Sequence, residues 1–316
     1  MMSKFMSLDE GMMVIEEAIK KARRIIQGQP ETEFTVEEYL KFYECVYFMC
    51  AYRRTDEEPM KIYDRFKGSL EESIVSFVLP SLTQKNDASL LTELVVMWSN
   101  YKKMSTWLRE LFEYLDEFFI PSYSKNLASL EETCINCFQQ LVLEKLFCEL
   151  CAAAISLINH ERVGLHIDQN VLKNALLVFV EFDGYGRSNF CEKFEKAMLE
   201  ECATYYSRLA QEWLLYDSCA DYFQKVQWCI NQERIRASCY FPSGAGEKLL
   251  KVVIDQLVEK RIANLIEKQQ SENCGFATDY QEMLSKCAGM RLEEGTPAST
   301  PGEWLSSLMA SSARIG

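Results

Sequence analysis

Apolar residues recur every three or four positions along most of the chain, with charged residues between them. This spacing places apolar side chains on one face of a helix, whereas strands would show strict alternation. Long helical segments follow one another with short breaks between them: 10–28, 34–53, 58–82, 87–121, 129–162, 168–184, 189–217, 218–241 and 246–270. The pattern therefore predicts an all-α stack of roughly ten to twelve antiparallel helices.

Local signals mark where individual helices begin and end. Thr35, followed by Glu37 and Glu38, is typical of a helix N-terminus. Pro80 predicts the end of the third segment, because proline has no amide N–H to donate. The 316 residues include only 13 glycines and 7 prolines, and such sparse turn residues favour helices over a sheet protein.

The stretch EEYLKFYECVYFMC carries two apolar rows on one helix. Phe42, Val46 and Met49 form the first row, at spacings of three and four. Tyr43 and Tyr47 form a second row, rotated from the first by about 100°. Two interpretations stay open: a central helix packed on both sides, or a core row with a second, partner-facing aromatic row.

The net charge of −13, with a pI near 4.9, disfavours binding to nucleic acid or to anionic membrane surfaces. No apolar run reaches the roughly 20 residues that span a bilayer, and the first residues do not resemble a signal peptide. We therefore expect a protein of the cytoplasm and nucleus, without nucleic-acid or membrane partners.

Thirteen cysteines raise the question of a metal site. Cys134, Cys137, Cys148 and Cys151 form two CxxC pairs, as zinc knuckles do. The ten residues between the pairs contain no turn former, and on a continuous helix Cys137 and Cys148 would lie about 16 Å apart. Buried, reduced thiols are therefore the favoured interpretation over zinc, and we expect no metal and no cofactor.

Catalytic motifs are not found in the sequence. His160 and His166 are the two histidines, and a nucleophilic Cys–His pair has no further signature to support it. The chain has no Gly-rich phosphate loop, no HExxH and no GxSxG. We therefore expect an interaction protein without catalytic residues rather than an enzyme.

Several long blocks resemble the N-terminal region of cullins, and they are similar above all to the plant SCF-type class. These blocks are SLDEGMMVIEEAIKKARRIIQGQPETEF, YLKFYECVYFMC, IYDRFKGSLEESIVSFVLPSL, LLTELVVMWSNYKKMSTWLRELFEYLDEFFI, LINHERVGLHIDQNVLKNALLVFVEF and FEKAMLEECATYYSRLAQEWLLYDSCADYFQKVQWCINQERIRASCYF. The resemblance runs over about residues 6–270 in the order and spacing of that family. It implies an elongated stack of cullin repeats, each a five-helix bundle.

The resemblance also implies a division of the chain into repeats. Residues 1–125 would form an adaptor-binding first repeat, and residues 126–245 a second. Residues 246–290 would be a partial, diverged start of a third repeat. Residues 291–316, rich in Ser, Thr, Pro and Gly, are predicted to be a disordered tail.

In the family, the second and fifth helices of the first repeat bind a Skp-type adaptor, which carries an F-box protein. By resemblance, Tyr43 and Tyr47 match the adaptor-facing row of the second helix, while Met104 and Leu108 are assigned to the same surface by spacing. Glu117 stands where the family usually has a basic residue.

No segment resembles the RING-box-protein-binding half of cullins, so a RING-box partner is not expected. The resulting hypothesis is a truncated cullin-like scaffold that competes for adaptors. The alternative is a helical structural remnant without adaptor binding.

Overall fold

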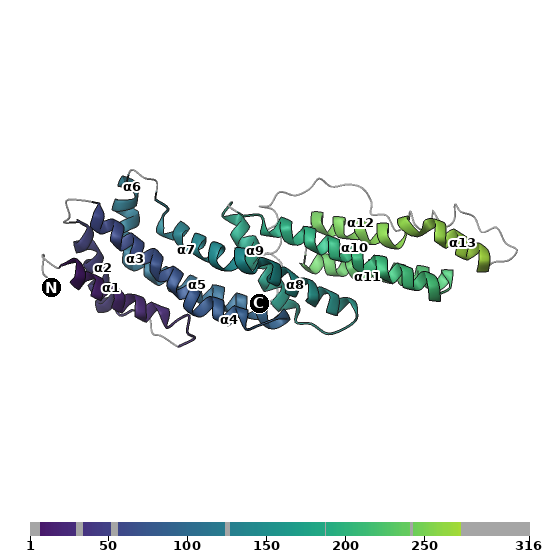
Figure 1. Ribbon diagram of the computed structural model, residues 1–316, viewed down its shortest axis with the longest axis horizontal. Helices are drawn as coiled ribbons and strands as arrows, with labels where there is room; N and C mark the ends of the chain where they lie inside the picture. The colour runs from purple at the N-terminus through teal and green to yellow at the C-terminus, as the bar shows by residue number, and fades with distance from the viewer. Residues whose placement is uncertain are drawn as a thin grey trace. The chain divides into compact units, whose positions relative to one another are not determined.

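Every regular element in the part of the chain that the structure describes is a helix, which confirms the predicted all-α fold (Figure 1). The structure is a computed structural model and describes residues 7–29, 34–51, 56–123, 127–186, 188–240 and 243–272. It divides into two compact units, Met1–Leu157 and Ile158–Gly316, and each is described by itself.

The first unit is a helical bundle. Helix α2 packs against α1, α3 and α5, and α3 and α5 also pack against α7. Large apolar side chains such as Phe66, Phe112 and Phe138 are completely buried between these helices. The helices are α1 (Leu8–Arg23), α2 (Val36–Ala51), α3 (Glu57–Ser73), α4 (Leu79–Thr83), α5 (Asp87–Tyr114), α6 (Ile120–Ser122), α7 (Leu130–Phe138) and α8 (Glu144–Arg162), whose last turn, from Ile158, belongs to the second unit.

Two prolines of this unit lie inside helical segments instead of ending them. A π-helical turn, η1 (Ile74–Val78), precedes Pro80, and the helix continues through α4, so the predicted helix end at Pro80 is wrong. A second π-helical turn, η2 (Leu115–Phe119), precedes Pro121 in the same way. The wider turn gives room to a ring that would clash with the carbonyl four residues earlier in a regular α-helix. A third π-helical turn, η3 (Gln139–Leu143), joins α7 and α8 without a proline.

Helices α1 and α2 approach closely at Gly11. A Cβ atom on Gly11 would lie 2.1 Å from Sδ of Met49, which is too short for any real contact. The Cys45 thiol fills the space beside this contact and donates to the Gly11 carbonyl at 3.4 Å. The missing side chain of Gly11 therefore allows the buried row of α2 to reach the backbone of α1.

The second unit is built on a pair of long helices, α10 and α11, that both pack against α12 (Figure 1). The Tyr222 hydroxyl is buried and donates to the Leu257 carbonyl at 2.6 Å, which ties α11 to α12. The helices are α9 (Gln169–Gly184), α10 (Phe190–Tyr216), α11 (Cys219–Tyr240), α12 (Ser243–Leu257), a short 3₁₀ turn η4 (Glu259–Arg261) and α13 (Ile262–Glu272).

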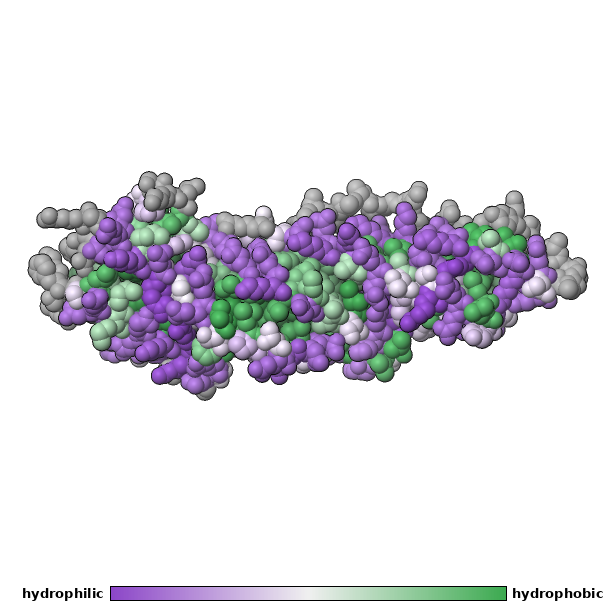
Figure 2. All heavy atoms as spheres, viewed as in Figure 1, coloured by the Kyte–Doolittle hydropathy of each residue, from purple (hydrophilic) through white to green (hydrophobic). Residues whose placement is uncertain are grey.

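The repeat boundaries stay predictions, because the two compact units are a division by contacts and not by repeat. The predicted tail, 291–316, lies outside the described residues, as does 273–290 of the predicted third repeat. Hydrophilic residues cover most of the face seen in Figure 2, with apolar residues gathered in separate patches. None of the described helices combines the length and the apolar character needed to cross a bilayer.

Candidate functional site

Helix α2 presents the two rows that its sequence predicts. Thr35 caps the helix: its hydroxyl accepts from the Glu38 amide at 3.2 Å, and the Glu38 carboxylate accepts from the Thr35 amide at 2.8 Å. Phe42, Val46 and Met49 are at most 3% exposed, which confirms the predicted core row.

The tyrosine row of α2 lies beside this core and stays partly open to solvent. Tyr43 and Tyr47 are both half-buried, so the helix is not covered on both sides by the described chain. The Tyr43 ring stacks on Tyr39, with centroids 6.0 Å apart. The Tyr47 ring packs edge to face against Tyr114, with ring centroids 5.3 Å apart, and the centroids of Tyr114 and Phe118 are 4.8 Å apart.

These rings form one surface, which we call the aromatic face. It consists of Tyr39, Tyr43 and Tyr47 from α2, Tyr114 from the last turn of α5, and Phe118 from η2. Phe118 is 56% exposed although it is a large apolar side chain. Val36 and Leu40, at 75% and 48% exposure, extend the apolar surface along α2. An exposed cluster of amphipathic and apolar rings is typical of a protein-binding surface.

Met104 and Leu108 do not belong to this face, and their assignment by spacing is wrong. Both side chains are 0% exposed. They belong to a row of buried residues on α5, spaced three or four positions apart, that faces the bundle core. The other members of this row are Leu94, Met97, Trp98, Tyr101, Ser105, Leu111 and Phe112.

Sequence reasoning missed Tyr114 and Phe118. Their spacing of four puts them on one side of the helical segment, and the concentration of rings in EYLDEFF was the available signal. That signal was ambiguous, because Phe119 in the same run is 6% exposed and therefore belongs to the core.

Carboxylates border the aromatic face. Glu110, Glu113 and Glu117 are exposed along the same side of α5 and η2. Partial burial raises the pKa of the Tyr39 and Tyr43 hydroxyls, and these carboxylates raise it further. The tyrosines therefore stay neutral and can donate hydrogen bonds to a partner. Glu117 stands where the resemblance to cullins implies a basic residue, and it adds a negative charge at the edge of the aromatic face.

The cysteines serve packing in the structure. Cys134, Cys137 and Cys151 are buried, and burial raises the pKa of each thiol to about 12, which opposes the thiolate form that binds zinc. Cys148 is exposed. Within the described ranges, no three His, Cys, Asp or Glu residues come together in a way that could hold a metal ion.

The sequence has relatives among known proteins. Residues 15–291 match the family model described as "Cullin alpha solenoid domain". The chain is 36% identical over 268 residues to "Putative cullin-like protein 2" of Arabidopsis thaliana, a match that covers 83% of this chain and 70% of the relative. "Cullin-like protein 3" of Arabidopsis thaliana is 34% identical over 239 residues, covering 75% of this chain and 91% of the relative.

A third relative is much longer than the matched region. "Cullin-1" of Oryza sativa subsp. japonica is 38% identical over 268 residues, which cover 85% of this chain and 36% of Cullin-1. The chain therefore spans about a third of the length of this relative.

Proposed function

The chain belongs to the cullin family, whose members are ubiquitin-ligase scaffolds rather than catalysts, and on that premise we propose that it binds a Skp-type adaptor of SCF ligases. Through the adaptor it would contact F-box proteins and take part in ubiquitin-dependent protein catabolism. The observation that carries the proposal is the aromatic face, a partly exposed row of rings beside the buried core row of α2.

The contacts of the aromatic face support this role. Tyrosine is enriched among the residues that dominate binding energies, because its ring buries a large area while its hydroxyl keeps a hydrogen bond. The ring contacts between Tyr47, Tyr114 and Phe118 hold these side chains in place before a partner arrives. A preorganised surface loses less side-chain entropy on binding.

We propose further that the chain competes with full-length cullins for adaptors. An adaptor whose binding surface is covered by the aromatic face of this chain cannot bind another cullin at the same surface. In this proposal, the substrates of an adaptor that this chain occupies would be withheld from the full-length cullins. A helical remnant without adaptor binding is the alternative that the following experiment separates.

The test is a binding titration of the full chain with a purified adaptor–F-box pair. Replacement of Tyr43 and Tyr47 together by alanine is expected to weaken binding by about 2 kcal/mol or more, which is about 30-fold. Val96→Ala is the matched control, because Val96 is 42% exposed on α5 but lies about 27 Å along the helix from Tyr114. If the folded chain does not bind the adaptor–F-box pair at concentrations of tens of micromolar, the proposal is refuted and the alternative, a helical remnant without adaptor binding, holds.

Two further variants separate surface from core on the same helical segment. Phe118→Ala is expected to weaken adaptor binding by about 1 kcal/mol while the free energy of unfolding stays nearly unchanged, because the ring is mostly exposed. Leu108→Ala is expected to lower the free energy of unfolding by about 2–5 kcal/mol, because it opens a cavity in the core. If Phe118→Ala leaves the affinity unaltered, η2 lies outside the interface.

A further inference from the structure

A groove lies between α10 and α11, far along the chain from the aromatic face. Its walls are Tyr205, Leu209 and Trp213 from α10, and Trp228 and Gln232 from α11. The wall residues recur every four positions on each helix, so they line one continuous hollow of about 260 Å³. Trp228 is 56% exposed, which is unusual for so large a ring on a folded bundle.

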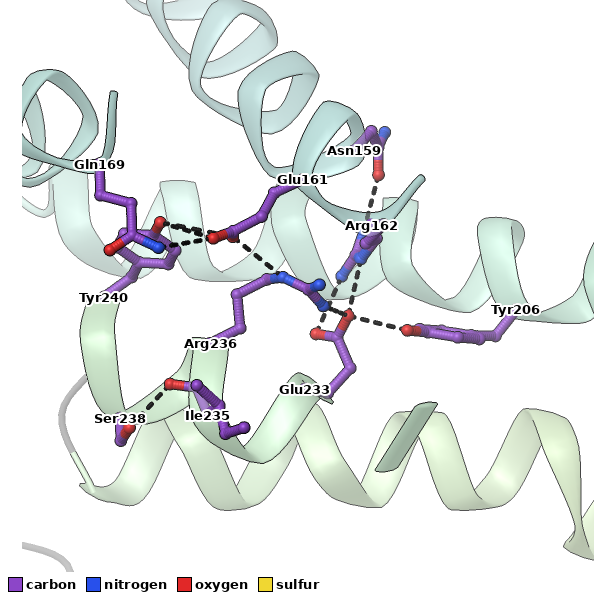
Figure 3. A network of polar contacts seen from close by, with 10 residues as sticks. All are labelled: Asn159, Glu161, Arg162, Gln169, Tyr206, Glu233, Ile235, Arg236, Ser238 and Tyr240. Atoms are coloured by element: carbon purple, nitrogen blue, oxygen red, sulfur yellow. Dashed lines mark hydrogen bonds and ion pairs between the residues drawn. The ribbon is translucent and has the colours of Figure 1, made fainter. Parts of the chain in front are cut away.

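The floor of the groove is held by a buried polar network (Figure 3). Glu233 accepts from Arg162 Nε at 2.9 Å and from the Tyr206 hydroxyl at 2.8 Å, and it also pairs with Arg236. Arg162 binds Asn159 at 2.8 Å as well, and its side chain is 1% exposed. The network fixes the guanidinium groups from several directions, so the groove has a rigid base.

Cations surround the aromatic walls. The Arg208 guanidinium lies 5.8 Å from the Tyr205 ring centre, and the Lys225 ammonium lies 5.4 Å from that of Trp213. Lys225 is paired with Asp217 at 2.7 Å, whereas exposed Arg208 has no ion-pair partner among the residues that the structure describes. Arg162, Arg236 and Lys225 line the groove, but they are paired with Glu233, Glu161 and Asp217, so exposed Arg208 beside the Tyr205 wall is the cation available to a partner's carboxylate.

The size and charge of the groove limit what it accepts. Its volume is below the roughly 300–1,000 Å³ of pockets that enclose whole small molecules, so one bulky side chain fits it better. Arg208 at the rim repels a positively charged occupant and favours a negative group beside it. The aromatic walls favour a planar apolar ring.

We propose that the groove between α10 and α11 docks an acidic partner polypeptide, which inserts one aromatic side chain between Tyr205 and Trp228 and places a carboxylate beside Arg208. This surface is independent of the aromatic face.

The probes are two blocked tripeptides, acetyl-Glu-Trp-Glu-amide and acetyl-Lys-Trp-Lys-amide, titrated into the full chain labelled with 5-fluorotryptophan. Fluorine NMR reports on Trp213 and Trp228 separately, and Trp98 and Trp107 of the first unit serve as references. The acidic peptide is expected to shift the groove resonances saturably and to bind about fivefold more tightly than the basic one. The absence of a saturable shift, or equal binding of both peptides, overturns the proposal.

Variants test each part of the groove. Arg208→Glu is expected to remove the preference for the acidic peptide, and Trp228→Ala to abolish the shift of Trp213. Ile235→Ala is the matched control, because this side chain is 59% exposed on the same helix and does not line the groove. Circular dichroism confirms that each variant is folded. Retention of the charge preference in Arg208→Glu contradicts the proposed placement of the carboxylate.

Discussion

Replacement of Glu233 by glutamine is expected to destabilise the second unit strongly. The Glu233 side chain is 0% exposed and accepts hydrogen bonds from Arg162, Arg236 and Tyr206. Glutamine keeps the shape but removes the charge. Arg236 retains an ion pair with Glu161 at 3.0 Å, whereas Arg162 loses its carboxylate partner and keeps the neutral Asn159 oxygen, the amide oxygen of the new glutamine and its stacking on tyrosine rings.

The magnitude follows from the buried charge that is left behind. Breaking a buried ion pair by removing one partner costs about 3–5 kcal/mol, because the remaining charge stays desolvated. We expect Glu233→Gln to fall in this range. Tyr206→Phe removes one hydrogen bond and leaves the carboxylate its two guanidinium partners, so we expect a loss of only about 1.5 kcal/mol.

The assay is urea unfolding of the full chain, followed by the fluorine resonances of Trp213 and Trp228, which both lie in the second unit. These resonances isolate the relevant transition, which a signal averaged over both units would not do. The reasoning that the paired charges dominate the network would be refuted if Glu233→Gln lowered the free energy of unfolding by less than about 1 kcal/mol. It would also be refuted if Tyr206→Phe lowered it more than Glu233→Gln does.

The same variant has a defined pH dependence. Burial by itself would raise the pKa of Glu233, but the Arg162 and Arg236 guanidiniums lower it on balance below its ordinary value of 4.5. A lowered folded-state pKa means that the carboxylate stabilises the fold above that ordinary value and that this contribution is lost as the pH falls through the folded-state pKa. The difference between wild type and Glu233→Gln is therefore expected to shrink in acid, and a difference that grows there would contradict the sign.

Two further predictions concern packing in the first unit. Gly11→Ala is expected to lower the free energy of unfolding by about 1–3 kcal/mol, because the added Cβ clashes with Met49. Gly68→Ala is expected to raise it by about 0.5–1 kcal/mol, because no neighbouring atom lies nearer than 3.5 Å to the added Cβ. Thermal melts of both variants check the two signs. Exposed Cys148 is expected to react with a thiol reagent in the native chain, while buried Cys151, whose pKa is raised to about 12, reacts only after unfolding. Mass spectrometry of the labelled chain locates the modified thiol, and early labelling of Cys151 would contradict its burial.

Much of the fold follows from local periodicity. The buried row of α2 and its Thr35 cap are features of neighbouring residues, so the sequence alone predicts them correctly. The continuation of a helix past Pro80 was not predictable in this way. The π-helical turn before it accommodates the ring, and the packing of α3 and α4 in the bundle outweighs the lost hydrogen bond.

The candidate surfaces show the same division. The rotation of Tyr43 and Tyr47 away from the core row is visible in the sequence. Which apolar row of α5 meets solvent is not visible there, and the assignment of Met104 and Leu108 to the surface was therefore wrong. The pairing of Arg162 with Glu233 joins residues 71 positions apart, and no spacing rule reaches that distance.

The sequence by itself determined that this chain is helical, where its helices lie, and which stripe of each helix is apolar, because these depend on propensity and on the 3.6-residue period. The tertiary structure decided which apolar stripes are covered. Burial is a property of two surfaces in contact, and a helix does not encode whether its neighbour reaches a given row. For this reason the aromatic face and the groove between α10 and α11 became visible only when the helices were packed.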